Sequence, residues 1–348
     1  MKRVLIQLNR FANPIEQVFL MAFTCLVLVG LTYKALNSHK IFDAYPHILQ
    51  IEAQKKQNLT PIKTGFFLRN FIDFDMPKND FLFEGVVWFV FDSKKVSQDI
   101  IEKFSFNKGE ILKDGLLANR NSMFKREMPD GKTFVRYDVR VKFTSNLNYH
   151  FFPIDSHKLS IVLNNKFLDA NKFYFDIDKT QTIFSDSLFT PGWTRINQDV
   201  ESGYGQTILD THNKELNSTF PRAIFTMDFV TSSFRDILLI FLPLFVVFFL
   251  SLFVFSFNPH NKDIILGISA SVVPAILGYR FVIETMSPKV SYFILSDHIF
   301  TMFLILAFLL FFMNTFYIEK LKNYHGILIL TFHSLLIFSW TYLLFLWK

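Results

Sequence analysis

Hydrophobic residues are concentrated in long uninterrupted runs toward the two ends of the chain. In the last third, residues 237–257, 299–316 and 327–346 contain no Asp, Glu, Lys or Arg. Apolar runs of about 17–25 residues are long enough to cross a bilayer as α-helices. A shorter apolar run, Val18–Tyr33, lies near the N-terminus. The pattern therefore predicts a multi-pass membrane protein.

The segment Asp263–Thr285 differs from the other apolar runs because it carries small and polar residues at helical spacing. Large aliphatic residues fill most of the segment, and the small or polar positions are Asp263, Gly267, Ser271, Gly278 and Thr285. Residues at this spacing share one face of a helix. Such a face either packs against small-residue partners or lines water, and the pattern leaves both interpretations open.

Basic residues precede the N-terminal apolar run. Lys2, Arg3 and Arg10 come before Val18–Tyr33, a pattern that signal peptides and membrane anchors share. No small-x-small cleavage motif follows, so we interpret residues 1–37 as a cytoplasmic stub with an uncleaved anchor helix. Basic residues before a membrane helix predict a cytoplasmic N-terminus, which places the next domain outside.

The middle of the chain predicts a β domain. The expected strands, rich in aromatic and β-branched residues, are 66–74, 82–91, 135–143, 159–163, 172–176 and 223–230. Turn-forming residues separate them at 77–79, 129–131, 164–165 and 191–192. Strands at this spacing predict an antiparallel β-sandwich over residues 61–232. Residues 38–60 are expected to form a polar, helical linker, and residues 233–348 a four-helix membrane domain. The fold class is therefore α+β, with an extra N-terminal membrane helix.

Composition and charge exclude several classes of protein. Hydrophobic residues make up 51% of the 348 residues, and the net charge of +6 is scattered, which argues against nucleic-acid binding. Cys25 is the single cysteine, so neither an intrachain disulfide nor a thiolate metal site is possible. No nucleophile elbow, glycine-rich phosphate loop or metal-ligand spacing is present, so we expect no enzyme, catalytic residue, cofactor or metal site.

Several short motifs occur in an order that is similar to that of one family. Phe152-Pro153-Ile154-Asp155 resembles a turn at the base of a β-sandwich, and Thr190–Trp193 a turn that opens a later strand. Pro243 lies in the first helix of the membrane domain, and Glu284–Lys289 with Tyr292 ends the second. Together, residues 60–348 resemble the pentameric ligand-gated ion channels, especially bacterial members. The family's cysteine-bridged loop would run from Ser145 to Leu159, without its cysteines here.

The resemblance implies a homopentamer in the plasma (inner) membrane, with permeant ions crossing a central pore. It implies that the second helix of the membrane domain lines that pore, with Asp263, Gly267, Ser271, Pro274, Gly278 and Glu284 as the lining residues. A ring of Asp263 carboxylates at the cytoplasmic mouth would favour cations, and the neighbouring Lys262 would oppose it. Arg280 has two interpretations, an ion pair with Glu284 one turn away or an outer ring of charge.

The resemblance also implies residues that couple the two domains and residues that bind a ligand. The coupling candidates are Asp75, Asp155, Arg235, Pro288, Lys289 and Tyr292. An unknown small-molecule ligand would bind between subunits among aromatic side chains, for which the candidates are Trp88, Phe89, Phe173, Tyr174 and Tyr204. An aromatic cage of this kind favours cationic amines.

The sequence departs from the family at three points. The anchor helix lies outside the resemblance, and Thr231 stands where the family has an arginine, with Arg235 one helical turn later. Pro274 falls at the family's hydrophobic-gate position when counted back from Pro288; a second register instead aligns residues 266–269 with the family's similar run. These departures keep an alternative open, a non-conducting, membrane-anchored periplasmic sensor or accessory subunit with the same fold.

Overall fold

The computed structural model describes residues 9–38, 41–112, 124–177, 183–185, 187–213, 216–231, 234–257, 261–317, 320–321 and 324–346. Lys2 and Arg3, used above to predict the orientation of the N-terminus, lie outside these residues. Internal contacts divide the chain into two compact units. The helical unit comprises Met1–Lys40, Tyr149–Asp155 and Ser233–Lys348, and the β unit comprises Ile41–Asn148 and Ser156–Ser232.

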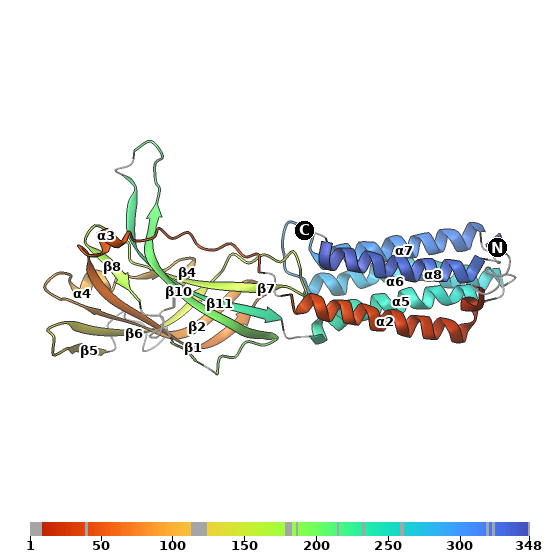
Figure 1. The fold of residues 1–348 in the computed structure, drawn as a ribbon, viewed down its shortest axis with the longest axis horizontal. Helices are drawn as coiled ribbons and strands as arrows, with labels where there is room; N and C mark the ends of the chain where they lie inside the picture. The colour runs from red at the N-terminus through yellow and green to blue at the C-terminus, as the bar shows by residue number, and fades with distance from the viewer. Residues whose placement is uncertain are drawn as a thin grey trace. The chain divides into compact units, whose positions relative to one another are not determined.

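The β unit is built from two sheets (Figure 1). The seven-stranded sheet has the order β4 (Gly109–Ile111), β6 (Thr133–Phe143), β2 (Asp80–Phe91), β1 (Thr60–Asp75) and β8 (Phe173–Asp176), with β5 (Phe124–Glu127) paired to β6 and β9 (Ile183–Phe184) paired to β1. The four-stranded sheet has the order β10 (Trp193–Thr207), β11 (Ser218–Thr231), β7 (Ser156–Asn164) and β3 (Ser105–Phe106). Two short helices belong to this unit: α3 (Ala53–Lys56) precedes β1, and α4 (Gln98–Ile101) lies between β2 and β3.

All six predicted strands are present, and their turns have the expected chemistry. Asn79, Gly131 and Gly192 have φ angles of 54°, 76° and 77°, the left-handed conformation that Gly and Asn adopt most readily. The strand expected to open at the Thr190–Trp193 turn is β10. Its length was not predicted, because most of its residues are polar and only partly buried, so no apolar alternation marks them.

Aromatic side chains fill the space between the two sheets. Phe66 on β1 and Phe225 on β11 are fully buried, and their ring centroids lie 4.8 Å apart. Phe74 and Phe229 repeat this contact between the same two strands at 5.2 Å. Burying one such side chain stabilises the fold by about 1.5–3 kcal/mol. The high Phe content of the chain thus serves the β core as well as the apolar helices.

The linker prediction was wrong for most of its length. Of the linker residues that the structure describes, only Ala53–Lys56 are helical, while Ile41 and Leu49 form backbone bridges to Ser156 and Tyr204. Extended backbone satisfies its polar groups by pairing with a strand, and β10 offers a free sheet edge for this. The approach requires Gly203, because a Cβ atom there would lie 2.4 Å from the carbonyl oxygen of Leu49.

Among its described residues, the helical unit contains five helices that are long and apolar enough to cross a membrane. They are α2 (Pro14–Leu36), α5 (Phe234–Leu252) continued by η5 (Phe253–Ser256), α6 (Lys262–Met286), α7 (Leu295–Tyr317), and α8 (His325–Thr341) continued by η7 (Tyr342–Leu346). A short turn, η1 (Asn9–Ala12), precedes α2. Asn13 caps α2 by accepting a hydrogen bond from the N–H of Ile15.

The N-terminal helix α2 packs against α8 through a buried, partly polar face. The hydroxyl of Thr24 lies 2.8 Å from Nδ1 of His333, and the indole of Trp340 donates to the hydroxyl of Thr32 at 3.2 Å. Both pairs are buried, where hydrogen bonds between helices add specificity to packing. α2 is therefore an integrated helix of the bundle. Its retention after membrane insertion stays a prediction.

The aromatic core yields a prediction about stability. Replacing Phe66 by Ala removes a fully buried ring and leaves a cavity, which should lower the free energy of unfolding by about 3–5 kcal/mol. The matched change Phe189→Ala removes a ring that is 68% exposed, and it should alter the free energy of unfolding by less than about 0.5 kcal/mol. Thermal unfolding of the detergent-extracted protein measures both; equal effects would contradict this account of the core.

Candidate functional site

Helix α6 has one covered face and one uncovered face. Its buried residues are Ile265, Ser269, Val272, Ile276 and Ile283. The residues singled out as pore candidates are exposed: Asp263, Gly267, Ser271, Pro274 and Gly278. At about 100° per residue, the two sets lie on opposite sides of the helix. The small and polar face is therefore the one that the helices of its own chain leave open.

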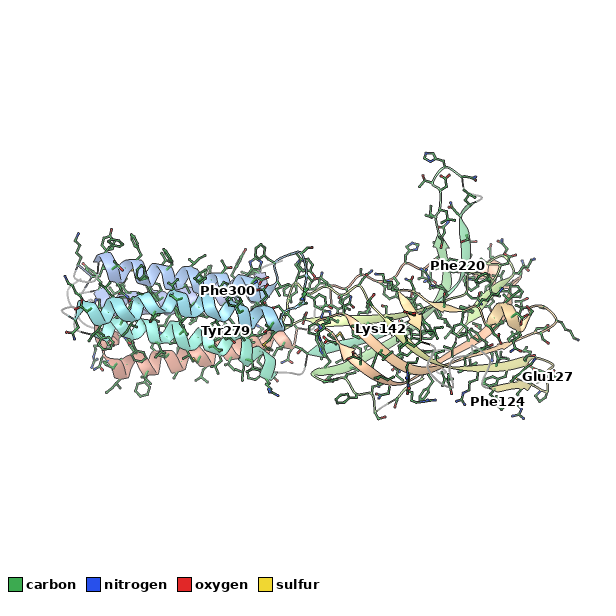
Figure 2. The ribbon with its side chains drawn as sticks, turned by 180° about the vertical axis from the view of Figure 1, so that it is seen from behind. Phe124, Glu127, Lys142, Phe220, Tyr279 and Phe300 are labelled. Atoms are coloured by element: carbon green, nitrogen blue, oxygen red, sulfur yellow. The ribbon has the colours of Figure 1, made fainter. Side chains whose placement is uncertain are left out.

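Two side-chain contacts hold α6 in this rotational setting. The amide of Asn314 on α7 donates to the hydroxyl of Ser269 at 2.9 Å, and both residues are buried. The hydroxyl of Tyr279 donates to the carbonyl of Leu239 on α5 (Tyr279 is labelled in Figure 2). Turning α6 about its axis would break both bonds and bring apolar residues to the open face.

The glycines on the open face do not serve close helix packing within the chain. A Cβ atom built at Gly267 or at Gly278 would meet no atom within 4 Å. Of the two interpretations of the polar stripe, packing against small residues therefore does not apply within one chain. Pro274 is exposed on the same face, and α6 continues through it from Lys262 to Met286.

Phe281 is an additional residue on the open face. It follows Pro274 by seven residues, which is close to two helical turns, and its side chain is 74% exposed. Sequence reasoning missed it because an aromatic residue does not interrupt an apolar run. Its exposure beside a polar stripe, which depends on how α6 packs, is the signal that identifies it.

The charge of Arg280 is directed to α7. Its guanidinium forms an ion pair with Asp297 and lies 5.4 Å from the ring centroid of Phe300, which Figure 2 labels on α7. Asp297 also accepts the N–H of Ile294 at 3.0 Å, so one carboxylate neutralises the arginine and caps the start of α7. The predicted pairing of Arg280 with Glu284 was wrong, and Glu284 is exposed near the end of α6.

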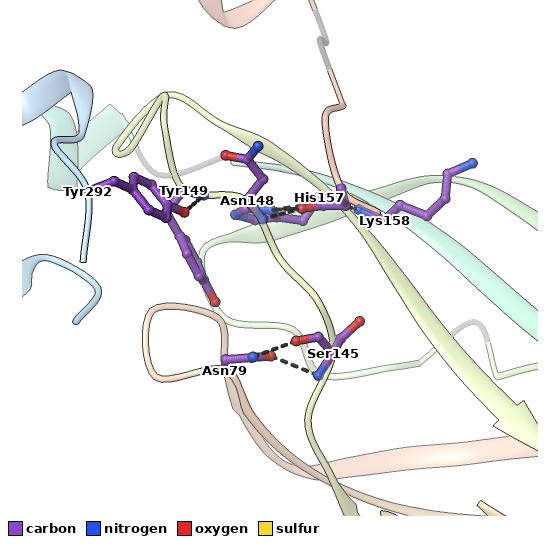
Figure 3. Close-up of polar contacts among 8 residues, drawn as sticks. Asn79, Ser145, Asn148, Tyr149, His157, Lys158 and Tyr292 are labelled. Carbon is purple, nitrogen blue, oxygen red and sulfur yellow. Dashed lines mark hydrogen bonds and ion pairs between the residues drawn. The ribbon is translucent and has the colours of Figure 1, made fainter. Parts of the chain in front are cut away.

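The Phe-Pro turn belongs to the helical unit. We call its residues, Tyr149–Asp155, the Pro153 loop; the peptide bond before Pro153 is cis. Tyr292 binds this loop, since its hydroxyl accepts the N–H of Tyr149 at 3.0 Å and its ring stacks on His150 with centroids 4.1 Å apart (Figure 3). The loop therefore contacts the segment between α6 and α7.

The same loop also holds the first residues of α7. The N–H of Leu295 donates to the carbonyl of His150 at 2.8 Å, and the N–H of Ser296 donates to that of Phe152 at 3.2 Å. The first N–H groups of a helix have no partner inside the helix. Two loop carbonyls thus complete the start of α7, so a displacement of the loop must change these bonds.

The other coupling candidates have varied surroundings. Asp155 is buried in the Pro153 loop and Pro288 is buried after α6, whereas Lys289 is exposed. Arg235 is exposed in the first turn of α5. Asp75 forms an ion pair with Lys78 at 2.6 Å within its own turn. Tyr292 contacts the loop directly, and the coupling roles of all six candidates stay predictions.

The aromatic ligand candidates do not form one group. Phe89 and Phe173 belong to the buried core of the β unit, whereas Trp88 is half-buried. The hydroxyl of Tyr204 donates to the carbonyl of Phe173 at 3.2 Å, and the ammonium of Lys56 lies 5.0 Å from the ring centroid of Tyr174. Tyr174 thus already has a cation over its ring, and the role of all five residues in binding stays a prediction.

The two tyrosines of this region remain neutral near physiological pH. Burial raises the pKa of the Tyr174 hydroxyl, and the charge of Asp176 adds to this. Burial likewise raises the pKa of the Tyr204 hydroxyl. Both hydroxyls therefore stay protonated and able to donate hydrogen bonds.

Comparison with known proteins does not assign the chain to a family. No protein-family model matches it, and no curated protein matches it significantly. The fold itself defines a multi-span membrane protein, in which an apolar N-terminal helix and a β domain of two sheets precede four long apolar helices. Within the described residues, no group of three or more His, Cys, Asp or Glu side chains could hold a metal ion.

The ion pair between α6 and α7 yields a prediction. Asp297→Asn keeps an acceptor for the N–H of Ile294 but leaves Arg280 without its counter-charge, so it should destabilise the protein by about 1–3 kcal/mol. Glu284→Gln, a matched change at an exposed carboxylate, should cost less than about 0.5 kcal/mol. Thermal unfolding in detergent compares them. Equal stability of both variants would mean that the pair contributes nothing measurable.

Proposed function

We propose that this protein is one subunit of a homopentameric, ligand-gated ion channel in the plasma (inner) membrane. The observation that carries the proposal is the open face of α6, where small and polar residues are exposed opposite a fully packed apolar face. One polar stripe cannot enclose water by itself. Several copies arranged around an axis can, and the packed faces then point outward to the rest of each bundle.

The remaining features agree with this proposal. The order of β domain and four helices resembles the pentameric channels, as do the motifs around Pro153 and Tyr292. We place the N-terminus in the cytoplasm and the β unit outside, where it would bind a small molecule between subunits. The Pro153 loop would transmit binding, because it already contacts Tyr292 and completes the start of α7.

Asp263 sets the proposed ion preference. Its carboxylate is exposed in the first turn of α6, where the helix dipole also tolerates negative charge. A ring of carboxylates in a narrow pore mouth concentrates cations and repels anions. Lys262 is exposed beside it, but its long side chain can reach away from the axis to lipid headgroups. We therefore propose cation selectivity, with Phe281 as a bulky apolar residue farther along the same face.

Stoichiometry and cysteine accessibility test the function together. In a Cys25→Ser background, cysteines at Gly267 and Ser271 should react with a charged, membrane-impermeant thiol reagent, and their modification should change ionic current. Cysteines at Ile265 and Val272 should not react, because these residues are buried against the bundle. The purified protein should form fivefold particles.

Exposed apolar positions provide the matched control. Leu250 on α5 and Phe308 on α7 are each 57% exposed in one chain, yet we expect lipid to cover them in the membrane. Cysteines there should resist the charged reagent, although these positions, like those on α6, are exposed in the isolated subunit. Fivefold particles without ion flux would support the non-conducting sensor, and equal protection of Gly267 and Leu250 cysteines would contradict the pore.

Ion substitution tests the role of Asp263. The reversal potential in asymmetric salt should report cation preference in the wild type and a several-fold weaker preference in Asp263→Asn, because the carboxylate ring loses its charge. Lys262→Gln is the neighbouring control and should preserve or increase cation preference. Anion preference in the wild type would mean that a basic residue controls the pore.

A further inference from the structure

A buried carboxylate from the N-terminal linker lies at the neck of the Pro153 loop. The side chain of Asp43 is only 1% exposed. One oxygen accepts the N–H of Asn148 and the other accepts the N–H of Lys158, each at 2.5 Å (the pairs at Asn148 and Lys158 appear in Figure 3). Asn148 directly precedes the loop and Lys158 follows its last residue by three positions, so the two residues are ten positions apart in the sequence. A single carboxylate therefore bridges both strands of the neck.

Neighbouring contacts hold Asp43 in this position. Nδ1 of His157, a fully buried residue, lies 3.3 Å from both carboxylate oxygens, and the ring of His157 packs on Trp193. Two positions earlier, Ile41 pairs with Ser156 in a parallel backbone bridge. The carboxylate is thus fixed by its own backbone and by the imidazole, with no freedom to turn to solvent.

A second, separate clamp lies farther from the loop on the same strand. Asn79, in the turn between β1 and β2, donates from its amide to the carbonyl of Ser145 at 2.5 Å and accepts the N–H of Ser145 at 2.9 Å (Figure 3). This clamp holds only the incoming strand. Asp43 instead accepts hydrogen bonds from both the incoming strand and the outgoing one, so its carboxylate closes the neck.

We propose that Asp43 is a positioning residue that closes the Pro153 loop without a covalent bond and thereby sets the contacts of that loop with the start of α7. The N-terminal linker then takes part in the proposed coupling, because it contributes the carboxylate that holds the loop. The closure of the loop is a feature of the fold and does not depend on the proposed channel function. Its effect on gating rests on the proposed channel function.

Physical chemistry supports a carboxylate in this role. Hydrogen bonds to an ionised acceptor are shorter and stronger than neutral ones, and the accepting carboxylate is almost fully buried at this site. Removing the carboxylate leaves two partly buried donors without this acceptor, which costs more than the bonds themselves contribute. The neck would then open to admit water, and the loop carbonyls that hold Leu295 and Ser296 would lose their fixed position.

Hydrogen exchange of the full-length protein, read by mass spectrometry, tests the closure. Asp43→Ala should raise exchange by about tenfold or more at Asn148 and Lys158, because each loses a charge-assisted bond. The distinguishing readout is the N-terminal turn of α7. If Asp43 positions the loop, exchange at Leu295 and Ser296 should rise as well, although neither touches Asp43. Asp43→Asn, which keeps one acceptor oxygen, should produce a smaller change and serves if the alanine variant does not fold.

A carboxylate in a different turn supplies the control. Asp92 accepts the N–H of Lys94 at 3.0 Å, and Asp92→Ala should leave exchange at Leu295 and Ser296 unchanged. Increased exchange confined to Asn148 and Lys158 would overturn the positioning role, and wild-type exchange at all four amides would overturn the closure itself.

Current recordings then separate the closure from the gating role. With tetramethylammonium as the probe, a cation of the class that an aromatic cage favours, Asp43→Asn should shift the probe concentration for half-activation, while Asp92→Ala should not. Increased exchange at α7 with unchanged activation would retain the closure and refute its part in gating. Absence of current in the wild type would instead refute the proposed function and leave the exchange result standing.

Discussion

The rotational setting of α6 is the constraint on which the chemistry of this molecule depends. Burial of one apolar face, the bond between Asn314 and Ser269, and the pairing of Arg280 with Asp297 together fix which face is left open. Apolar burial is not directional, so it cannot select a rotation as sharply as hydrogen bonds do. The polar pairs therefore make the open face a defined surface, with Asp263, Gly267 and Ser271 along it.

Hydrogen bonds between specific polar groups also hold the Pro153 loop in place. Its carbonyls complete the N-terminal turn of α7, and its neck is closed by the carboxylate of Asp43. A chain with a single cysteine has no intrachain disulfide with which to close a loop. Buried, charge-assisted hydrogen bonds provide closure that can be broken and reformed, which suits an element proposed to move. The polar seam between α2 and α8 is a further example of buried polar pairs that specify packing.

Much of the fold could be predicted because its strongest signals are local. Apolar runs identify the membrane helices by length alone, and the alternating aromatic strands lie where Phe66 and Phe225 face a common core. The length of β10 and the extended backbone of the linker escaped prediction for one reason. Their backbones are held by pairing with distant segments, and Gly203 marks the contact only once the partner is known. A polar segment that pairs at a sheet edge has no periodicity of its own.

For the candidate site, the sequence by itself determined the small and polar stripe of α6 and the loop motif around Pro153, because residue type and helical spacing are local properties. Only the tertiary structure decided that this stripe is uncovered, that Phe281 shares its face, and that Arg280 is neutralised by Asp297 on another helix. It likewise decided that Asp43 closes a loop more than a hundred residues away in the chain. Such pairings depend on which segments meet after folding, and no pattern within either segment encodes its partner.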